Sequence, residues 1–396
     1  MIFVFHFSDN AFDIATLFYQ YFPFSSDTSR SAVDVLYSNG SNEEITIKPH
    51  NSQLQTNASN ISVIPVNLNE PEKIFKILPW TGFFSKTWMF PGRKDLKRCA
   101  YNNCEVFHDH QRLDEADAVL VHMRSIDGIS DLPPYHIPSQ KWIMAMHESP
   151  MFKEIDYTQF NDMFNATWTY SARSDIYDPH GFTVRLENPA KELDVPAHAR
   201  HKNKLVAWFV SNCDTPSKRE LFVRELQKYI PIDIVGECGP YKCPIDQQGT
   251  CHQILERDYK FYLAFENSIC EGYATEKVWK VLTTFTVPIV LGGHDYKTIL
   301  PPNSFIDILD FPSSKHLAEH ILNVSANDTL YNSFFKWKKD YEVIAKRKHK
   351  CRICEYLNKS SGKTKIYGSL DTFWNEQAQC LTPLDYYRNT DELFSL

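Results

Sequence analysis

Short apolar runs alternate with polar or helix-like stretches along most of the chain. A first set of strand-like runs lies at Ile74–Leu78, Ala118–His122 and Lys141–Met146. A second set follows at Leu205–Val210, Ile232–Val235, Phe261–Phe265 and Val287–Leu291. Continuous apolar runs of this length are typical of strands that are buried on both faces of a parallel sheet. The pattern therefore predicts an α/β protein with two successive Rossmann-like βα arrays.

Helical periodicity fills the intervals between these runs. Ser217–Tyr229 and Ala274–Thr284 are predicted as amphipathic helices of the second array. Leu317–Arg347 carries Leu330, Phe334 and Trp337 near helical spacing, so helix is expected there too.

The composition changes along the chain suggest where the domains begin and end. Residues 1–70 are rich in Ser, Asn and Asp with little periodicity, which favours a glycosylated stem of low order. A first domain is expected at 71–190, a linker at 191–203 and a second domain at 204–345. The linker belongs to a stretch that contains Pro189, Pro196 and few large apolar residues. A cleft between the two arrays is the expected active site.

Bulk composition narrows the class of protein. The 396 residues are 43% hydrophobic, enough for a sizeable core, and the length favours two domains. The formal net charge of −7 argues against nucleic acid or an anionic membrane as the main partner, because both require a basic face. Any phosphate binding must therefore be local.

The ten cysteines are compatible with disulfides or with zinc. Zinc is disfavoured because only Cys351-Arg-Ile-Cys354 has a two-residue gap and no second such pair lies nearby. Disulfides require a secretory protein, and the density of Asn-x-Ser/Thr sites favours one. The seven candidate N-glycosylation sites are Asn39, Asn57, Asn60, Asn165, Asn323, Asn327 and Asn358.

A membrane anchor is not evident in the sequence. Met1–Phe5 is apolar, but His6, Asp9 and Asp13 interrupt the run, and a membrane span needs roughly 20 apolar residues. A secretory protein must carry some entry signal, so we expect either an anchor outside this chain or an unusual start.

The segment 259–279 concentrates the residues most suited to catalysis or binding. A strand-like run ends at Glu266 and Asn267, and a helix is expected to begin soon afterwards. Thr275 could cap that helix, Glu276 lies in its first turn, and Lys277 can reach a ligand beside the free backbone N–H groups. This arrangement suits a diphosphate, although an ordinary strand, loop and capped helix would share the local features.

The order of residues in this region makes the interpretation more specific. Phe-Tyr-Leu-Ala-Phe-Glu-Asn-Ser (261–268) is followed by Tyr-Ala-Thr-Glu-Lys (273–277) and Val-Pro-Ile-Val-Leu-Gly (287–292). This series resembles the signature of the α1,3-fucosyltransferase family, glycosyltransferase family 10. Further similar pieces, from Ile-Leu-Pro-Trp-Thr (77–81) to Val-Ala-Trp-Phe-Val-Ser-Asn (206–212), extend the resemblance over about residues 71–357.

The resemblance implies a GT-B fold, with two Rossmann-like domains facing across a cleft. In that fold the C-terminal domain holds GDP-fucose and the N-terminal domain holds the acceptor. Carried over residue by residue, the donor-binding positions are Ser211, Asn212, Arg219, Tyr262, Glu266, Asn267, Tyr273, Glu276 and Lys277. Arg219 and Lys277 would face the diphosphate and stabilise its growing charge, while Glu266 would accept hydrogen bonds from sugar hydroxyls.

The resemblance also points to a catalytic base. In Met-His-Glu-Ser-Pro (146–150) a strand ends on Glu148, and the corresponding Glu of the family is the proposed base. A helix-capping or salt-bridged Glu is the alternative. His147 is a rival base and Asp109, between two histidines, resembles a metal cluster; we interpret both as ordinary structural residues.

Cysteine pairing follows from the resemblance only in part. The family pattern implies Cys99–Cys351 and Cys104–Cys354, which would link the tail 346–396 back to the first domain. The other six, which allow fifteen pairings, are Cys213, Cys238, Cys243, Cys251, Cys270 and Cys380. The arrangement of Cys213, Cys238, Cys243 and Cys251 is similar to that of the invertebrate and plant subgroup that acts on the N-glycan core.

One element departs from the family. Its Tyr-Arg-Arg-Asp-Ser-Asp-Ile sequence is Tyr-Ser-Ala-Arg-Ser-Asp-Ile (170–176) here, with one basic and one acidic residue fewer. The family's acceptor contacts are therefore not carried over to this element.

The expected function is inverting transfer of L-fucose from GDP-fucose to O3 of N-acetylglucosamine in protein N-glycans. The partners are the donor and a glycoprotein acceptor, and the expected location is the Golgi lumen, as a type II membrane protein. Alternatives are a distal rather than core acceptor, another nucleotide sugar, or an inactive carbohydrate-binding relative. Since no Asp-x-Asp triplet is present, no metal is required, although the family allows stimulation by Mn²⁺ or Mg²⁺.

Overall fold

The computed structural model describes residues 73–83, 86–152, 155–196, 199, 201–242, 248–345 and 349–387. All of them belong to one compact unit, Pro71–Leu396. The predicted stem 1–70 lies outside the described residues.

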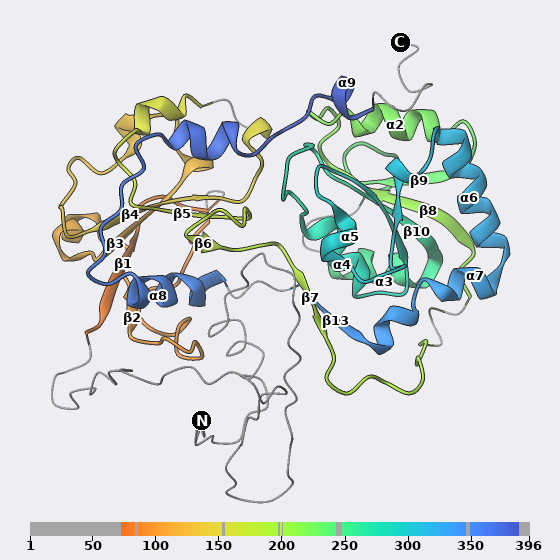
Figure 1. Ribbon diagram of the computed structural model, residues 1–396, viewed down its shortest axis with the longest axis horizontal. Helices are drawn as coiled ribbons and strands as arrows, with labels where there is room; N and C mark the ends of the chain where they lie inside the picture. Colours follow the sequence, from red (N-terminus) through yellow and green to blue (C-terminus); the bar gives the residue numbers. More distant parts are fainter. Residues whose placement is uncertain are drawn as a thin grey trace, which may run out of the picture. The chain divides into compact units, whose positions relative to one another are not determined.

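A first parallel sheet of six strands has the order β2-β1-β3-β4-β5-β6 (Figure 1). Its strands are β1 (Phe75–Pro79), β2 (Cys104–Val106), β3 (Ala118–His122), β4 (Lys141–Met146), β5 (Ala166–Thr169) and β6 (Ile176–Tyr177). β3 is buried at all five positions, as the uninterrupted apolar run predicts.

A second parallel sheet of five strands has the order β12-β11-β10-β8-β9. Its strands are β8 (Lys204–Phe209), β9 (Ile232–Val235), β10 (Tyr259–Phe265), β11 (Val287–Leu291) and β12 (Ile306–Asp307). Read from β9, and with β8 counted as its first strand, this sheet has the order 2-1-3-4-5. The first five strands of the other sheet have the same order. The predicted α/β class with two successive parallel sheets is confirmed.

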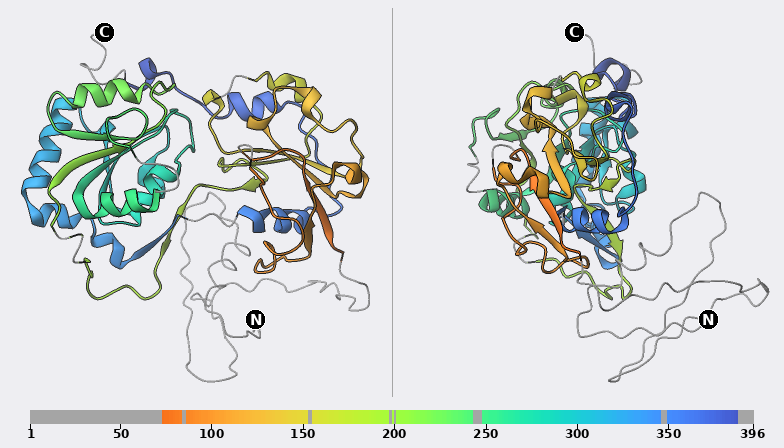
Figure 2. Two further views of the ribbon diagram at one scale, coloured as in Figure 1. Left: turned by 180° about the vertical axis from the view of Figure 1, so that it is seen from behind. Right: turned by 90° about the vertical axis from the view of Figure 1, so that its left-hand side faces the viewer.

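Helices cover both faces of the second sheet. The α-helices of this half are α2 (Arg219–Leu226), α3 (Gln248–Asp258), α4 (Glu276–Leu282), α5 (Tyr296–Ile299), α6 (Ser314–Ala326) and α7 (Asp328–Ser333). Residues of α2 and α6 share one core cluster with Phe261 and Ile289, whereas Val278 and Trp279 of α4 pack with Tyr262 on the opposite face. Figure 2, seen from behind, shows α6 and α7 in blue along one side of this half.

Part of the region expected to be helical is extended. From residue 317 to residue 345 the chain completes α6 and then forms α7, a short turn of helix at Lys336–Lys339 and finally β13 (Tyr341–Ile344). β13 pairs antiparallel with β7 (Phe182–Arg185), which the sequence pattern did not predict. The expectation of helix through residue 345 is wrong, because this strand finds its hydrogen bonds with a segment far away in sequence.

The tail returns to both sheets. α8 (His349–Lys359) packs Ile353 and Leu357 against the first sheet and carries the disulfides Cys99–Cys351 and Cys104–Cys354, the pairing that the resemblance implies. Beyond it, the chain continues through a π-helical turn (Thr372–Glu376) to α9 (Pro383–Tyr386), both visible in blue in Figure 1.

The end of the tail differs from the expectation that it packs on the first domain. Cys270–Cys380 is a disulfide, and the Tyr387 ring stacks 6.0 Å from that of Phe222 in the second core. Two large apolar side chains, Tyr386 and Tyr387, are buried there. The tail therefore connects the two sheets.

The remaining cysteines are also bridged within the described residues. Cys213–Cys238 is a disulfide and Cys251 is disulfide-bonded, while Cys243 lies outside the described residues. Short helical turns complete the structure at His110–Glu115, Met123–Ser125, Ile129–Asp131, Pro150–Phe152, Tyr157–Phe160 and Ile308–Asp310.

Candidate active site

The strand order locates the binding region of the second sheet. In an open parallel sheet, ligands bind beyond the carboxyl ends of the strands where the order reverses. That point lies between β8 and β10. The residues that follow these strands include Ser211 and Asn212, which are exposed, and Glu266 and Asn267, which are buried. Four of the predicted donor-binding residues therefore lie at the expected edge.

Glu266 occupies a closed hydrogen-bonding position. Its side chain is 0% exposed, and Oε1 accepts from the Thr275 backbone N at 2.7 Å. The Thr275 hydroxyl donates to the same carboxylate at 2.8 and 2.9 Å, so it does not cap α4 as predicted. Lys277 Nζ completes the set, 2.9 Å from Oε2. The prediction that Glu266 accepts from sugar hydroxyls does not fit these contacts, because protein donors surround the carboxylate.

Glu266, Lys277 and Glu276 form a cluster of opposite charges, with Lys277 Nζ 2.9 Å from Glu266 and 3.6 Å from Glu276. Burial raises the pKa of Glu266, and the Lys277 charge opposes this. Burial disfavours the charged form of Lys277, but Glu266 and Glu276 outweigh it and raise its pKa. Burial also acts on Glu276, yet Lys277 and His180 lower its pKa to about 2. Lys277 thus remains a cation, 20% exposed, at the edge of the site.

Arg219 lies deeper than predicted. It begins α2, is 4% exposed, and donates from Nη1 to the Phe265 carbonyl at 2.6 Å and from Nη2 to the Asn212 carbonyl at 3.4 Å. Its Nε has no hydrogen-bond partner among the described residues. Burial lowers the pKa of the guanidinium, and the nearby Glu266 opposes that shift. Arg219 joins the ends of β8 and β10.

Two further predicted donor-binding residues, Tyr262 and Asn267, lie on or just after β10. Tyr262 is buried on β10, its ring 5.5 Å from Phe209, and burial raises its pKa. Asn267 is 7% exposed, and its Oδ1 has no hydrogen-bond partner in the described part of the chain. A buried carbonyl oxygen without a donor is costly unless a ligand or water satisfies it.

Glu148 follows β4 in the first sheet and is half-buried. The Tyr273 hydroxyl, from the loop between β10 and α4, donates to Glu148 Oε2 at 3.1 Å. The next residue, Ser149, hydrogen-bonds Ser268 of the same loop at 2.6 Å. The structure therefore brings the predicted base together with Tyr273, one of the predicted donor-binding residues.

Two family models match the chain. Residues 199–374 match the one described as "Glycosyltransferase family 10 (fucosyltransferase) C-term", and residues 72–181 match "Fucosyltransferase, N-terminal". The chain belongs to glycosyltransferase family 10, the fucosyltransferases.

Curated relatives agree with this assignment. "Alpha-(1,3)-fucosyltransferase C" of Drosophila melanogaster is 31% identical, covering 75% of this chain and 77% of the relative. "Alpha-(1,3)-fucosyltransferase fut-1" of Caenorhabditis elegans is 35% identical, covering 72% of this chain and 67% of the relative. Among solved structures, the crystal structure of an α1,3-fucosyltransferase with GDP-fucose has a TM-score of 0.48 at 15% identity, over 76% of this chain and 94% of that one.

His147 and Asp109 of this fucosyltransferase have structural partners, in keeping with their interpretation from sequence. His147 is buried and its Nε2 lies 2.9 Å from Asp178 Oδ2. Asp109 accepts from the Gln111 backbone N at 3.0 Å, while the neighbouring His108 contacts the Met89 carbonyl at 2.7 Å. Within the described residues, no group of three or more His, Cys, Asp or Glu side chains could hold a metal ion.

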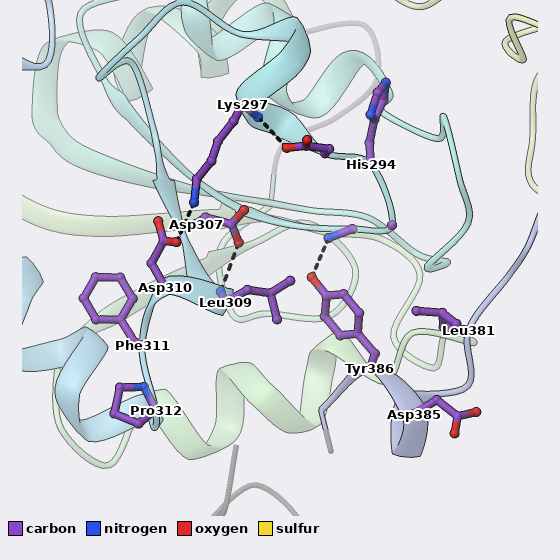
Figure 3. A pocket seen from close by; sticks show the side chains of 13 residues that line it. His294, Lys297, Asp307, Leu309, Asp310, Phe311, Pro312, Leu381, Asp385 and Tyr386 are labelled. Atoms are coloured by element: carbon purple, nitrogen blue, oxygen red, sulfur yellow. Dashed lines mark hydrogen bonds and ion pairs between the residues drawn. The ribbon is translucent and has the colours of Figure 1, made fainter. Parts of the chain in front are cut away.

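A cavity of about 620 Å³ lies beyond the ends of β11 and β12 and was not predicted (Figure 3). Four carboxylates line it, Asp295, Asp307, Asp310 and Asp385, together with Lys297, which pairs with Asp310 at 2.8 Å. Burial raises the pKa of Asp307 to about 6. The excess of negative charge makes this cavity unsuitable for a diphosphate.

Gly292, at the end of the family signature, separates this cavity from Glu266. A Cβ at Gly292 would lie 2.4 Å from Tyr296 Oη and 3.2 Å from Glu266 Cγ. The glycine is visible in the sequence, but only the fold shows that Tyr296 and Glu266 leave no room for a side chain at this position.

The candidate glycosylation sites differ in access. Asn323 and Asn327 are exposed, whereas Asn39, Asn57 and Asn60 lie outside the described residues. Asn165 is 9% exposed, and its Nδ2 donates to the Lys365 carbonyl at 3.0 Å. A glycan at Asn165 conflicts with this fold, because Nδ2 is the atom that would carry it.

Asn358 is more restricted than the two exposed sites. Its Nδ2 donates to Asn103 Oδ1 at 2.9 Å and to the Cys354 carbonyl at 2.8 Å, which occupies both hydrogens.

In the described part of the chain, no helix has the length and apolarity that a membrane crossing requires.

Proposed function

We propose that this α1,3-fucosyltransferase transfers L-fucose from GDP-fucose to O3 of N-acetylglucosamine in protein N-glycans, with inversion at the anomeric carbon. The family assignment and the relatives named α1,3-fucosyltransferases support the class of reaction. The observation that carries the proposed mechanism is the position of Glu148, a half-buried carboxylate at the carboxyl edge of the first sheet. Its only hydrogen bond within the described residues comes from Tyr273.

Direct displacement requires one base. Glu148 takes the proton of the acceptor hydroxyl while that oxygen attacks the anomeric carbon of fucose. The new bond joins the acceptor O3 to the anomeric carbon, the bond from that carbon to the β-phosphate oxygen breaks, and GDP leaves with the electron pair. A positioned general base contributes about 10²- to 10⁴-fold to the rate.

Lys277 provides the positive charge for the leaving group. Its ammonium is fixed by Glu266 and by the Thr275 hydroxyl, which accepts at 2.6 Å. A cation that is already held in place does not have to reorganise as charge develops on GDP. Glu266 therefore acts by orienting Lys277, and Arg219 by holding the strand ends that carry Asn212 and Glu266.

We expect this chemistry to proceed without a bound metal. Since Lys277 and its neighbours supply the charge at the diphosphate, EDTA should leave a basal rate. Stimulation by Mn²⁺ or Mg²⁺ is compatible with this, because a cation would add to the stabilisation that Lys277 provides.

The Golgi lumen, with a type II membrane anchor, is the proposed location. The disulfides support an oxidising compartment, and the exposed Asn323 and Asn327 are accessible to the glycosylation machinery. Expression in a secretory host should yield a protein whose mobility shifts after glycosidase treatment.

The N-glycan core is the proposed acceptor site. The Cys213–Cys238 disulfide belongs to the segment that is similar to the core-modifying subgroup. The names of the relatives include both a "Glycoprotein 3-alpha-L-fucosyltransferase A" of Drosophila melanogaster, 33% identical, and a "4-galactosyl-N-acetylglucosaminide 3-alpha-L-fucosyltransferase 9" of Mus musculus, 35% identical. Both kinds of acceptor therefore occur in the names of relatives of similar identity, and a transfer assay distinguishes them.

Acceptor choice can be measured with labelled fucose from GDP-fucose. We expect transfer to an N-glycopeptide with an intact core and antennae that end in N-acetylglucosamine, and little transfer to N-acetyllactosamine. Mass spectrometry of fragments places the label. Transfer confined to N-acetyllactosamine would contradict the core assignment and leave the donor and the base untouched.

A further inference from the structure

The loop that connects β10 to α4 packs away from its own sheet. Cys270 and Tyr273 are both fully buried in the core cluster of the first sheet, beside Tyr170 and Trp374. The Tyr170 and Tyr273 rings are 5.0 Å apart. This loop of the second half is therefore part of the core of the first.

Several bonds fix the loop in that position. Cys270 is disulfide-bonded to Cys380 of the tail, and the Glu271 backbone N donates to the Ala378 carbonyl at 2.8 Å. The Glu271 carboxylate accepts from Arg173 Nη2 at 2.9 Å. Arg173 also hydrogen-bonds the Gln377 carbonyl and belongs to the element in which this chain departs from the family pattern.

Tyr273 brings its hydroxyl to Glu148 as a neutral donor. It is 1% exposed, and burial raises its pKa well above the ordinary value, with Glu148 and Glu266 adding to the shift. A tyrosine that keeps its proton can donate to a carboxylate, whereas a phenolate would repel it. The hydrogen bond to Oε2 fixes the orientation of the Glu148 carboxyl group.

We propose that Tyr273 is a positioning residue for the base. Its hydroxyl holds Glu148 Oε2 so that the carboxylate is oriented for the acceptor proton, and the docked loop 268–275 sets the distance between the base and Lys277. This inference rests on the proposed function, since it assigns Tyr273 a task only if Glu148 removes a proton.

The chemistry gives a distinct signature. The hydrogen bond from Tyr273 fixes one oxygen of the carboxylate, at 3.1 Å. Its loss leaves the carboxylate without that orientation, so kcat falls while the KM for GDP-fucose does not change. The other titratable groups near the pair are Tyr170, His180, Glu266 and Glu276. All of them remain when Tyr273 loses only its hydroxyl.

Tyr273→Phe tests the proposal, with Tyr170→Phe as the matched control. Tyr170 is equally buried in the same cluster, and among the described residues its hydroxyl makes no hydrogen bond to Glu148. We expect Tyr273→Phe to lower kcat about 10- to 100-fold, as for loss of a hydrogen bond to a charged group, with the KM for GDP-fucose unchanged. Tyr170→Phe should keep the wild-type kcat and KM.

A second variant covers the event that Tyr273→Phe fails to fold. Arg173→Met releases the Glu271 side chain of the loop and should lower kcat in the same direction with the KM for GDP-fucose unchanged. Wild-type kcat in Tyr273→Phe, or an equal loss of kcat in Tyr170→Phe, would overturn the proposal. Glu148→Gln distinguishes failure of the proposed function from failure of the positioning role. If Glu148→Gln is fully active, Glu148 is not the base. If Glu148→Gln is inactive while Tyr273→Phe is normal, only the positioning role of Tyr273 fails.

Discussion

Glu148→Gln should lower kcat for fucose transfer about 10²- to 10⁴-fold while GDP still binds. The substitution preserves the size of the side chain and its ability to accept from Tyr273, at 3.1 Å in the wild type, but it removes the group that takes the acceptor proton. Because Lys277 and Asn212, which we propose to bind the donor, belong to the half of the chain with the second sheet, GDP affinity should stay within about twofold. Initial rates with radiolabelled GDP-fucose and calorimetric titration with GDP measure the two quantities.

Glu105→Gln is the matched control for this experiment. Glu105 is a half-buried carboxylate on β2 of the same sheet, so the same chemical change occurs away from the site. It should leave kcat unchanged. A Glu148→Gln enzyme with wild-type kcat would eliminate Glu148 as the base and require a different proton acceptor.

Lys277→Met should reduce both activity and stability. Removal of one preorganised group that stabilises developing charge costs about 10²- to 10³-fold in kcat. The same change leaves Glu266, at 0% exposure, without its cation, and breaking a buried pair destabilises a protein by about 3–5 kcal/mol. Urea denaturation and steady-state kinetics measure the two effects separately.

A double variant separates these effects. Glu266→Gln combined with Lys277→Met removes both members of the buried pair, so most of the stability should return. The activity should not return, because the cation for the diphosphate is still absent. Recovery of activity along with stability would show that Lys277 acts only as a structural partner of Glu266.

Much of the architecture was predictable from local pattern. Ala118–His122 and Val287–Leu291 are continuous apolar runs that became fully buried parallel strands within the predicted bounds. Burial on both faces leaves no polar position to interrupt the run, so the signal in the sequence is strong. β13 was missed because a four-residue strand at a surface carries no such signal.

The details of the site depended on contacts distant in sequence. Glu266 ends a strand and precedes a loop, so it was expected to face a ligand, yet Thr275 and Lys277 surround it. No local pattern shows that a carboxylate nine residues before a threonine will accept its hydrogen bonds. Tyr273 was carried over from the resemblance as a donor-binding residue, and no local pattern shows that it packs in the core of the first sheet beside Glu148.

NMR analysis of the product made from GDP-β-L-fucose and a defined N-glycan tests the proposed transfer. We expect an α-linked fucose on O3 of N-acetylglucosamine, formed by inversion in one displacement. Retention of the β configuration, or no transfer by a folded protein that binds GDP, would contradict it.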